Sequence, residues 1–161
     1  MTNGKRGFTL IELLVVIAII GLLSTLAVVA LNSARQKSRD SKRVADVKQI
    51  QTALELYFAD HQGYPTSNGV LGGASFKKLV NGGWVASNVT GTTTYMGLVP
   101  SAPKPIDGTC NSDANNDYTY AVGANNADYA LQFCTGTAVG ELTAGEQCAT
   151  SAGVVSTAAC P

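Results

Sequence analysis

One carboxylate, that of Glu12, lies inside a long apolar stretch near the start of the chain. The run from Phe8 to Leu31 has 24 residues, and Glu12 is its only charged member. A carboxylate in such a segment costs about 2.5–3.5 kcal/mol to place in a bilayer, so it normally has a partner or a function. The partner is either the side chain of Arg6 or a positive group on another chain. A cut after Gly7 would create such a group, because Phe8 would then carry a free α-amino group.

Four cysteines form the second set of reactive residues. All of them lie in the second half of the chain, at Cys110, Cys134, Cys148 and Cys160. An even number in an exported segment favours two disulfides, and four cysteines allow three connectivities. We prefer Cys110–Cys134 with Cys148–Cys160, because each pair closes a local loop. The first pair would also tie the leading edge of an expected hairpin to its end.

The remaining polar residues form no recognisable catalytic set in the sequence. The single histidine, His61, falls at a predicted helix end and is interpreted as a capping or surface group. Asp113, Asn115 and Asp117 alternate like the opening of a calcium loop, but Tyr118 stands where that loop needs glycine. A polar turn is the simpler interpretation, with calcium as the alternative. We therefore predict a protein that is not an enzyme and that needs no cofactor.

The apolar run predicts a membrane-inserted helix. As an α-helix its 24 residues would extend about 36 Å, enough to cross a bilayer core of about 30 Å. Lys5 and Arg6 would keep the short leader, residues 1–7, in the cytoplasm. The alternatives are a secretory signal peptide, which would have a shorter apolar core without a carboxylate, and a plain single-pass anchor.

Residues 32–61 continue the helix with an amphipathic pattern. Apolar residues recur mostly at spacings of three and four, which marks one face. They are Leu31, Ala34, Val44, Val47, Ile50, Leu54, Tyr57 and Phe58. The helix should end near His61–Pro65, where Gly63 and Pro65 stop its propagation.

Basic residues crowd the start of this amphipathic half. They are Arg35, Lys37, Arg39, Lys42, Arg43 and Lys48, against only Asp40 and Asp46. Three interpretations stay open: a solvated helix face, a contact surface between subunits, and a contact with lipid headgroups or DNA. Beyond residue 100 Lys104 is the only base against six acids, so the two regions can attract each other between subunits.

Residues 62–161 predict a small, loop-rich extracellular head. Residues 118–122 and 128–133 alternate like strands and should form a hairpin that lies on the apolar face of residues 44–58. A short helix is expected over residues 75–80, a core position for Trp84, and one further strand within residues 137–155. The fold class is therefore α+β, with a long N-terminal helix packed on a small antiparallel sheet.

The segment from Lys5 to Val16, KRGFTLIELLVV, resembles the class III signal of type IV pilins and of type II secretion pseudopilins. In that family a membrane peptidase cuts after the glycine and methylates the new N-terminal phenylalanine. The resemblance implies cleavage between Gly7 and Phe8 and N-methylation of Phe8. It also implies that Glu12 neutralises the N-terminal amine as subunits assemble. Major pseudopilins also bind calcium in a head loop, which keeps the calcium alternative open.

The resemblance further implies the pilin fold and a function. The chain would be a single-pass membrane protein before assembly, and then a subunit of an extracellular type IV pilus-like filament, a helical homo-oligomer. Its partners would be membrane lipid, the inner-membrane prepilin peptidase and the pilus assembly platform. Adhesion, motility and DNA uptake stay open as roles, and DNA or a host surface as further partners. The alternatives are a pseudopilin of a secretion or competence system and a membrane-anchored extracellular binding module.

Overall fold

The structure is a computed structural model. It describes residues 7–86, 89, 91–110, 112–155 and 160, apart from the side chains of Asp113, Asn115 and Val155. The chain divides into two structural units, residues 1–35 and 36–161. One helix, α1 (Leu10–His61), provides the secondary structure of the first unit and continues into the second.

In the first unit α1 is an uninterrupted apolar helix. Its most apolar 18-residue window has a mean hydropathy of 2.9 and no buried residue, so its length and composition suit a membrane span. The Ser24 hydroxyl donates to the carbonyl oxygen of Ile20 at 2.7 Å, and the Thr25 hydroxyl donates to that of Leu22 at 2.8 Å. These polar side chains are therefore satisfied within the helix.

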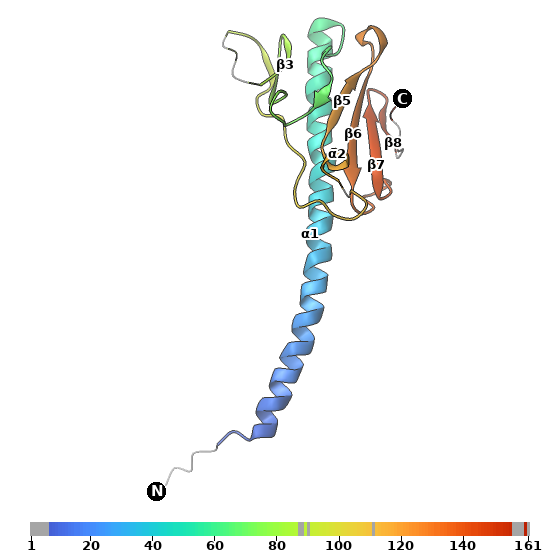
Figure 1. Ribbon diagram of the computed structural model, residues 1–161. Coiled ribbons are helices and arrows are strands. Elements are labelled where there is room, and N and C mark those ends of the chain that lie inside the picture. Colours follow the sequence, from blue (N-terminus) through green and yellow to red (C-terminus); the bar gives the residue numbers. More distant parts are fainter. Residues whose placement is uncertain (1–6, 87–88, 90, 111, 156–159, 161) are drawn as a thin grey trace. The chain divides into compact units, whose positions relative to one another are not determined.

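The second unit builds its core between α1 and two antiparallel sheets. The first sheet has the strand order β1-β5-β6-β7-β8, and the second has the order β3-β2-β4. The strands are β1 (Gly69–Val70), β2 (Lys78–Val80), β3 (Gly83–Val85), β4 (Thr94–Met96), β5 (Thr119–Val122), β6 (Tyr129–Thr135), β7 (Gly145–Thr150) and β8 (Gly153–Val155). A short helix, α2 (Asp113–Asn116), and a 3-10 turn, η1 (Ala124–Asn126), complete the described elements. In Figure 1 strands β5 to β8 lie on one side of α1 and β3 lies on the other.

The predicted hairpin forms and covers the predicted helix face. Strands β5 and β6 pair antiparallel, with Tyr120 opposite Leu131. Both side chains are fully buried in one cluster with Ile50 and Leu54 of α1. Trp84 joins the same cluster, which confirms its predicted core position.

Two of the local predictions are wrong. Residues 78–80 form strand β2 instead of part of a short helix, because Leu79 pairs with Trp84 across a two-residue turn. Residues 137–155 contain two strands, β7 and β8, where one was expected. Strand β7 is rich in glycine, alanine and polar residues, so its sequence lacks the alternation that reveals a strand.

The helix ends where the sequence predicts, but a different residue terminates it. α1 stops at His61, and Gln62, not Gly63, adopts the left-handed conformation with φ 56°. The Gln62 backbone N–H donates to the carbonyl oxygen of Phe58 at 2.8 Å, which closes the last turn.

Candidate functional site

The start of α1 is a capping box built from Thr9 and Glu12. The backbone N–H of Thr9 donates to Glu12 Oε2 at 2.9 Å, and the Thr9 hydroxyl donates to the same oxygen at 2.7 Å. The Glu12 backbone N–H lies 3.3 Å from the Thr9 hydroxyl oxygen, which accepts its hydrogen bond. Each side chain therefore satisfies a backbone donor that the first helical turn leaves without a partner.

This capping box changes the expected environment of Glu12. Lys5 and Arg6 lie outside the described residues, so the expectation that Arg6 neutralises Glu12 stays a prediction. In the described part of the chain, Thr9 supplies the hydrogen bonds to the carboxylate. The T-x-x-E spacing in the sequence is the signal for this arrangement.

Gly7 and Phe8 precede the helix and are exposed. The Phe8 side chain is 83% exposed. A Cβ atom added at Gly7 would meet nothing within 4 Å among the described residues, so packing against them does not require glycine there. Phe8 and Glu12 also line a shallow apolar depression with Ile11, Val15 and Val16.

Arg43 lies at the centre of a buried polar cluster in the second unit. Its side chain is fully buried, and it donates to Asp40 Oδ1 at 2.6 Å and to Asn116 Oδ1 at 2.6 Å. It also donates to the carbonyl oxygen of Pro103 at 3.3 Å. Asp107 Oδ1 lies 3.5 Å from the guanidinium. The charge of Arg43 is therefore compensated by Asp40 within α1 and by polar groups distant in sequence.

Asp40 joins this cluster to the loop after β6. Its carboxylate accepts hydrogen bonds from the backbone N–H groups of Gly136 at 2.9 Å and Thr137 at 2.8 Å. The Thr137 hydroxyl donates to the same carboxylate at 2.6 Å. A Cβ atom at residue 136 would lie 2.6 Å from Asp107 Oδ1, so the close approach requires glycine.

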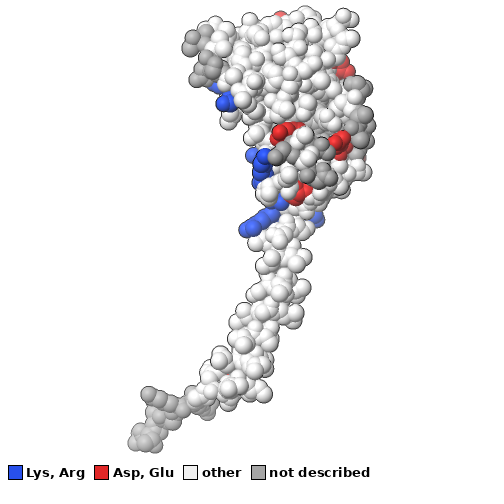
Figure 2. Space-filling view, in the orientation of Figure 1, with Lys and Arg blue, Asp and Glu red and all other residues white. Residues whose placement is uncertain are grey.

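These contacts correct the interpretation of the basic residues as one solvated face. Arg43 is buried, and Arg39 forms an ion pair with Asp107 at a site where both side chains are largely covered. Lys37, Lys42 and Lys48 are exposed. Figure 2 shows that most visible Lys and Arg side chains of the second unit lie along its left edge, with Asp and Glu toward the centre and right.

Asp46 and Tyr118 form a second buried polar contact near this cluster. The Tyr118 hydroxyl donates to Asp46 Oδ2 at 3.1 Å. Burial raises the pKa of the Asp46 carboxyl above its ordinary value of 3.8, although the Tyr118 hydrogen bond and the Lys42 charge act in the opposite direction. Burial and the neighbouring Asp46 raise the pKa of Tyr118. This tyrosine therefore stays protonated and acts as a hydrogen-bond donor.

The four cysteines form two disulfides. Cys110 is bonded to Cys134 and Cys148 to Cys160, with sequence separations of 24 and 12 residues. This is the connectivity that the sequence analysis preferred. Cys110, Cys134 and Cys148 are fully or almost fully buried, so these bonds fix the loop before α2 and the chain end to the first sheet.

The weak calcium candidate lies partly outside the described residues. The side chains of Asp113 and Asn115 are not described, and the backbone of residues 113–116 forms α2. Within the described part of the chain, no group of three or more His, Cys, Asp or Glu side chains could hold a metal ion.

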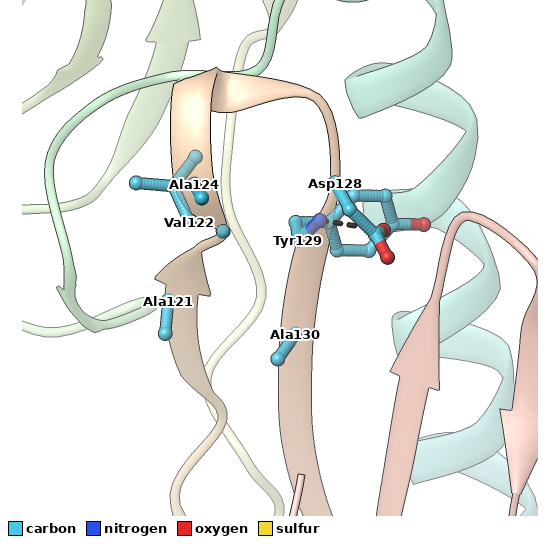
Figure 3. Close-up of a pocket in the computed structure, with 7 residues that line it drawn as sticks. Ala121, Val122, Ala124, Asp128, Tyr129 and Ala130 are labelled. Atoms are coloured by element: carbon cyan, nitrogen blue, oxygen red, sulfur yellow. Dashed lines mark hydrogen bonds between the residues drawn. The ribbon is translucent and has the colours of Figure 1, made fainter. Parts of the chain in front are cut away.

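A small pocket opens at the turn of the β5–β6 hairpin (Figure 3). Its walls are largely alanine and backbone, and Asp128 is its only acid. The Asp128 carboxylate accepts hydrogen bonds from the Tyr129 backbone N–H at 2.7 Å and from the Ser151 hydroxyl at 2.7 Å. Partial burial would raise its pKa, but these hydrogen bonds outweigh that effect and lower the pKa. Asp128 is thus a structural acceptor that links β6 to the β7–β8 turn.

His61 is exposed in the last turn of α1. Its ring stacks on Tyr57 with centroids 4.2 Å apart. Beside it the Tyr95 hydroxyl donates to Asp60 Oδ2 at 2.6 Å, and this hydrogen bond raises the pKa of Tyr95 to about 12. The surroundings of His61 are those of a surface residue at a helix end.

Sequence reasoning missed Asp40 and Arg43 as buried residues. Only apolar residues were used to trace the inner face of α1, so the polar positions were assigned to solvent. Their spacing carries a usable signal, because positions 40, 43, 47, 50 and 54 follow one another at intervals of three and four. The buried stripe therefore continues through charged residues.

Comparisons with known proteins agree with these features. The prokaryotic N-terminal methylation motif matches residues 2–28. Type II secretion system core protein G of Escherichia coli K12 is 43% identical over 67 residues, which are 42% of this chain and 46% of that protein. The protein of the same name from Vibrio cholerae is 37% identical over 64 residues, 40% of this chain and 44% of its own length. The chain thus spans about half the length of these secretion proteins.

A longer match extends into the second unit. Type IV major fimbrial protein FimA of Dichelobacter nodosus is 30% identical over 127 residues, which are 79% of this chain and 76% of that protein. No solved structure matches the chain. The methylation motif and the identity across three quarters of a fimbrial protein show that the chain belongs to the type IV pilin and pseudopilin family.

Proposed function

We propose that this protein is a structural subunit of a type IV pilus-like filament and assembles through its N-terminal helix. The observation that carries the proposal is the exposed apolar half of α1, whose most apolar window has no buried residue. A surface of this kind is stable in lipid or against other copies of the same helix. The subunit would wait in the membrane with residues 8–31 in lipid, and it would then bury them in the filament core.

Cleavage between Gly7 and Phe8 is the second part of the proposal. It is supported by the methylation motif and by the position of both residues outside α1. Among the described residues no packing contact requires glycine at position 7, which agrees with a requirement set by a processing peptidase. The inner-membrane prepilin peptidase and an assembly platform would be the corresponding partners.

Glu12 would then receive the new amine of a neighbouring subunit. In the described part of the chain Thr9 holds this carboxylate at the start of α1, near the exposed Phe8 side chain. A Phe8 amine from a second copy would give the carboxylate a charged partner where water is excluded. Because an unpaired buried charge is strongly unfavourable, this pairing would also fix the register between subunits.

A pseudopilin is the second candidate function. The similarity of residues near the N-terminus to type II secretion system core protein G supports it. Such a subunit would use the same helix and the same Glu12 contact in a shorter assembly inside the envelope. Neither function requires an enzymatic activity of this chain.

Substitution of Glu12 tests the shared assembly step. We expect Glu12→Ala to be inserted and cleaved like the parent chain but to form no filaments, as measured by immunoblots of sheared surface fractions. Glu12→Asp, which retains the charge on a shorter side chain, should assemble partially. Abundant filaments from the Glu12→Ala chain would refute the proposed role of this carboxylate.

A further inference from the structure

A groove on one side of the second unit carries two lysines and an exposed leucine. It encloses about 510 Å³ and is lined by Lys42 of α1, Lys77, and the segment that contains Leu98 and Pro100. Leu98 is 78% exposed, so its side chain adds apolar surface to this lining. Within the described part of the chain, neither Lys42 nor Lys77 forms an ion pair. The groove therefore offers positive charge next to apolar surface.

A tight turn at residues 139–142 carries an acidic side chain beside apolar ones. Val139 and Leu142 form two mutual backbone hydrogen bonds of 3.0 Å, so the turn between them is closed. Glu141 is exposed on this turn, and Val139 and Leu142 beside it are half-buried. Lys48 of α1 lines the same depression as Glu141, but among the described residues Glu141 makes no ion pair within 4.0 Å. The turn thus presents one carboxylate with apolar neighbours.

The groove and the turn lie on opposite sides of α1. Lys42 lines the groove, whereas Val44 and Lys48 line the depression next to the turn. At about 100° per residue, Val44 and Lys48 point roughly 120–160° away from Lys42 around the helix. In Figure 1 the same division separates β3 from β7 and β8, and Figure 2 shows bases and acids gathered toward different sides.

We propose that the Glu141 turn of one subunit docks in the Lys42–Lys77 groove of the next copy of this chain. Two different complementary surfaces form a heterologous contact, which continues from copy to copy and produces an open helical assembly. Charge complementarity selects a second copy as the occupant, because the groove is basic and apolar while the turn is acidic and apolar. This inference rests on the proposed self-assembly and assigns a contact to the part of the chain outside the membrane segment.

The positions of the groove and the turn along α1 also set the axial offset between neighbouring subunits. Lys42 precedes Val44 and Lys48 by two and six residues. At 1.5 Å per residue, the turn therefore lies about 3–9 Å further along the helix axis than the groove. With helices parallel, docking would shift adjacent subunits axially by a distance of that order.

Charge reversal followed by charge exchange tests this contact in the full chain. We expect Lys42→Glu with Lys77→Glu to reduce the yield of sheared filaments at least about tenfold, because like charges then face each other. Glu141→Lys alone should have the same effect. The chain with all three changes should form filaments with a yield within about twofold of the parent. The groove is then acidic and the turn basic, so the two surfaces attract each other again.

Two controls separate this contact from other causes. Lys37→Glu changes an exposed lysine of α1 that does not line the groove, and it should leave the yield unchanged. Membrane insertion and cleavage should match the parent chain for every variant, and circular dichroism should show that each variant is folded. If the parent forms no filaments, the proposed function itself fails and this contact fails with it. If the parent assembles and the reversals have no effect, or if the exchange does not restore assembly, the docking contact is wrong.

Discussion

The Arg43 guanidinium lies 2.6 Å from an oxygen of the Asp40 carboxylate, and both side chains are completely buried. These residues are separated by less than one turn of α1, so the helix itself brings them together. Asn116, Asp107 and the backbone of residues 136–137 complete the cluster. The pair therefore connects α1 to the segment before β5, including α2, and to the loop after β6.

Removal of Arg43 should destabilise the second unit strongly. Arg43→Ala leaves the Asp40 carboxylate buried without its counter-charge, and breaking a buried pair in this way costs about 3–5 kcal/mol. Urea unfolding of the full chain in detergent would measure the loss. Lys42→Ala, a change at the exposed neighbour, should alter the free energy of unfolding by less than about 0.5 kcal/mol. Equal stability of the two variants would contradict the role assigned to Arg43.

Asp46 should make the protein less stable as the pH rises. Burial raises the pKa of the Asp46 carboxyl in the folded chain above the ordinary value of 3.8. Its favourable contribution to the free energy of unfolding is therefore complete when the pH lies below that ordinary value. The contribution is lost as the pH rises through the raised pKa, because the buried carboxyl must then ionise. We expect Asp46→Asn to increase the melting temperature relative to the parent, and the increase should grow with pH.

Melting curves from about pH 3 to about pH 8 would test this sign. Glu141→Gln is a suitable control, because Glu141 is exposed and forms no ion pair among the described residues. At the upper end of the range, Asp46→Asn should raise the melting temperature by more than this control does. If the increase in melting temperature caused by Asp46→Asn became smaller as the pH rises, the raised pKa of Asp46 would be wrong.

Loss of the Thr9 hydroxyl should loosen the start of α1. Thr9→Val preserves the shape of the side chain but removes the N-cap, which typically costs about 0.5–2 kcal/mol. Amide hydrogen exchange at Glu12 and Leu13, measured by NMR in micelles, should become roughly 2- to 30-fold faster. Thr9→Ser should retain the slower exchange, and amides near Leu26 should not change in either variant. Unchanged exchange at Glu12 in Thr9→Val would show that Thr9 does not cap the helix.

The disulfide connectivity predicts which peptides remain linked. A non-reduced digest should contain Cys110 joined to Cys134, and Cys148 joined to Cys160, when analysed by mass spectrometry. The loops of 24 and 12 residues each correspond to about 3 kcal/mol of stabilisation by loop-closure entropy. Any peptide linking Cys110 to Cys148 or Cys160 would contradict both bonds.

The sequence reveals the elements whose pattern is strong and local. The long helix, its end near His61 and the β5–β6 hairpin all follow from apolar periodicity and turn residues. The family resemblance depends on a short specific string near Glu12. Each of these signals lies within a few neighbouring residues, so no knowledge of tertiary contacts is needed to detect it.

Other features depend on contacts between distant segments. Strand β2 exists because Leu79 meets Trp84 across a turn, although Leu79 and its neighbours also suit a helix. Arg43 is buried because a loop and helix α2, both more than 60 residues away, supply Asp107 and Asn116. Local propensity cannot show these partners, since tertiary contacts override it.

Cryo-electron microscopy of sheared surface filaments would test the central claim most directly. At a resolution that identifies side chains, we expect a helical assembly of this chain that begins at Phe8. Each Glu12 carboxylate should lie within hydrogen-bond distance of the Phe8 amine of a neighbouring subunit. Filaments whose subunits still contain residues 1–7, or in which Glu12 faces no neighbouring amine, would contradict the account.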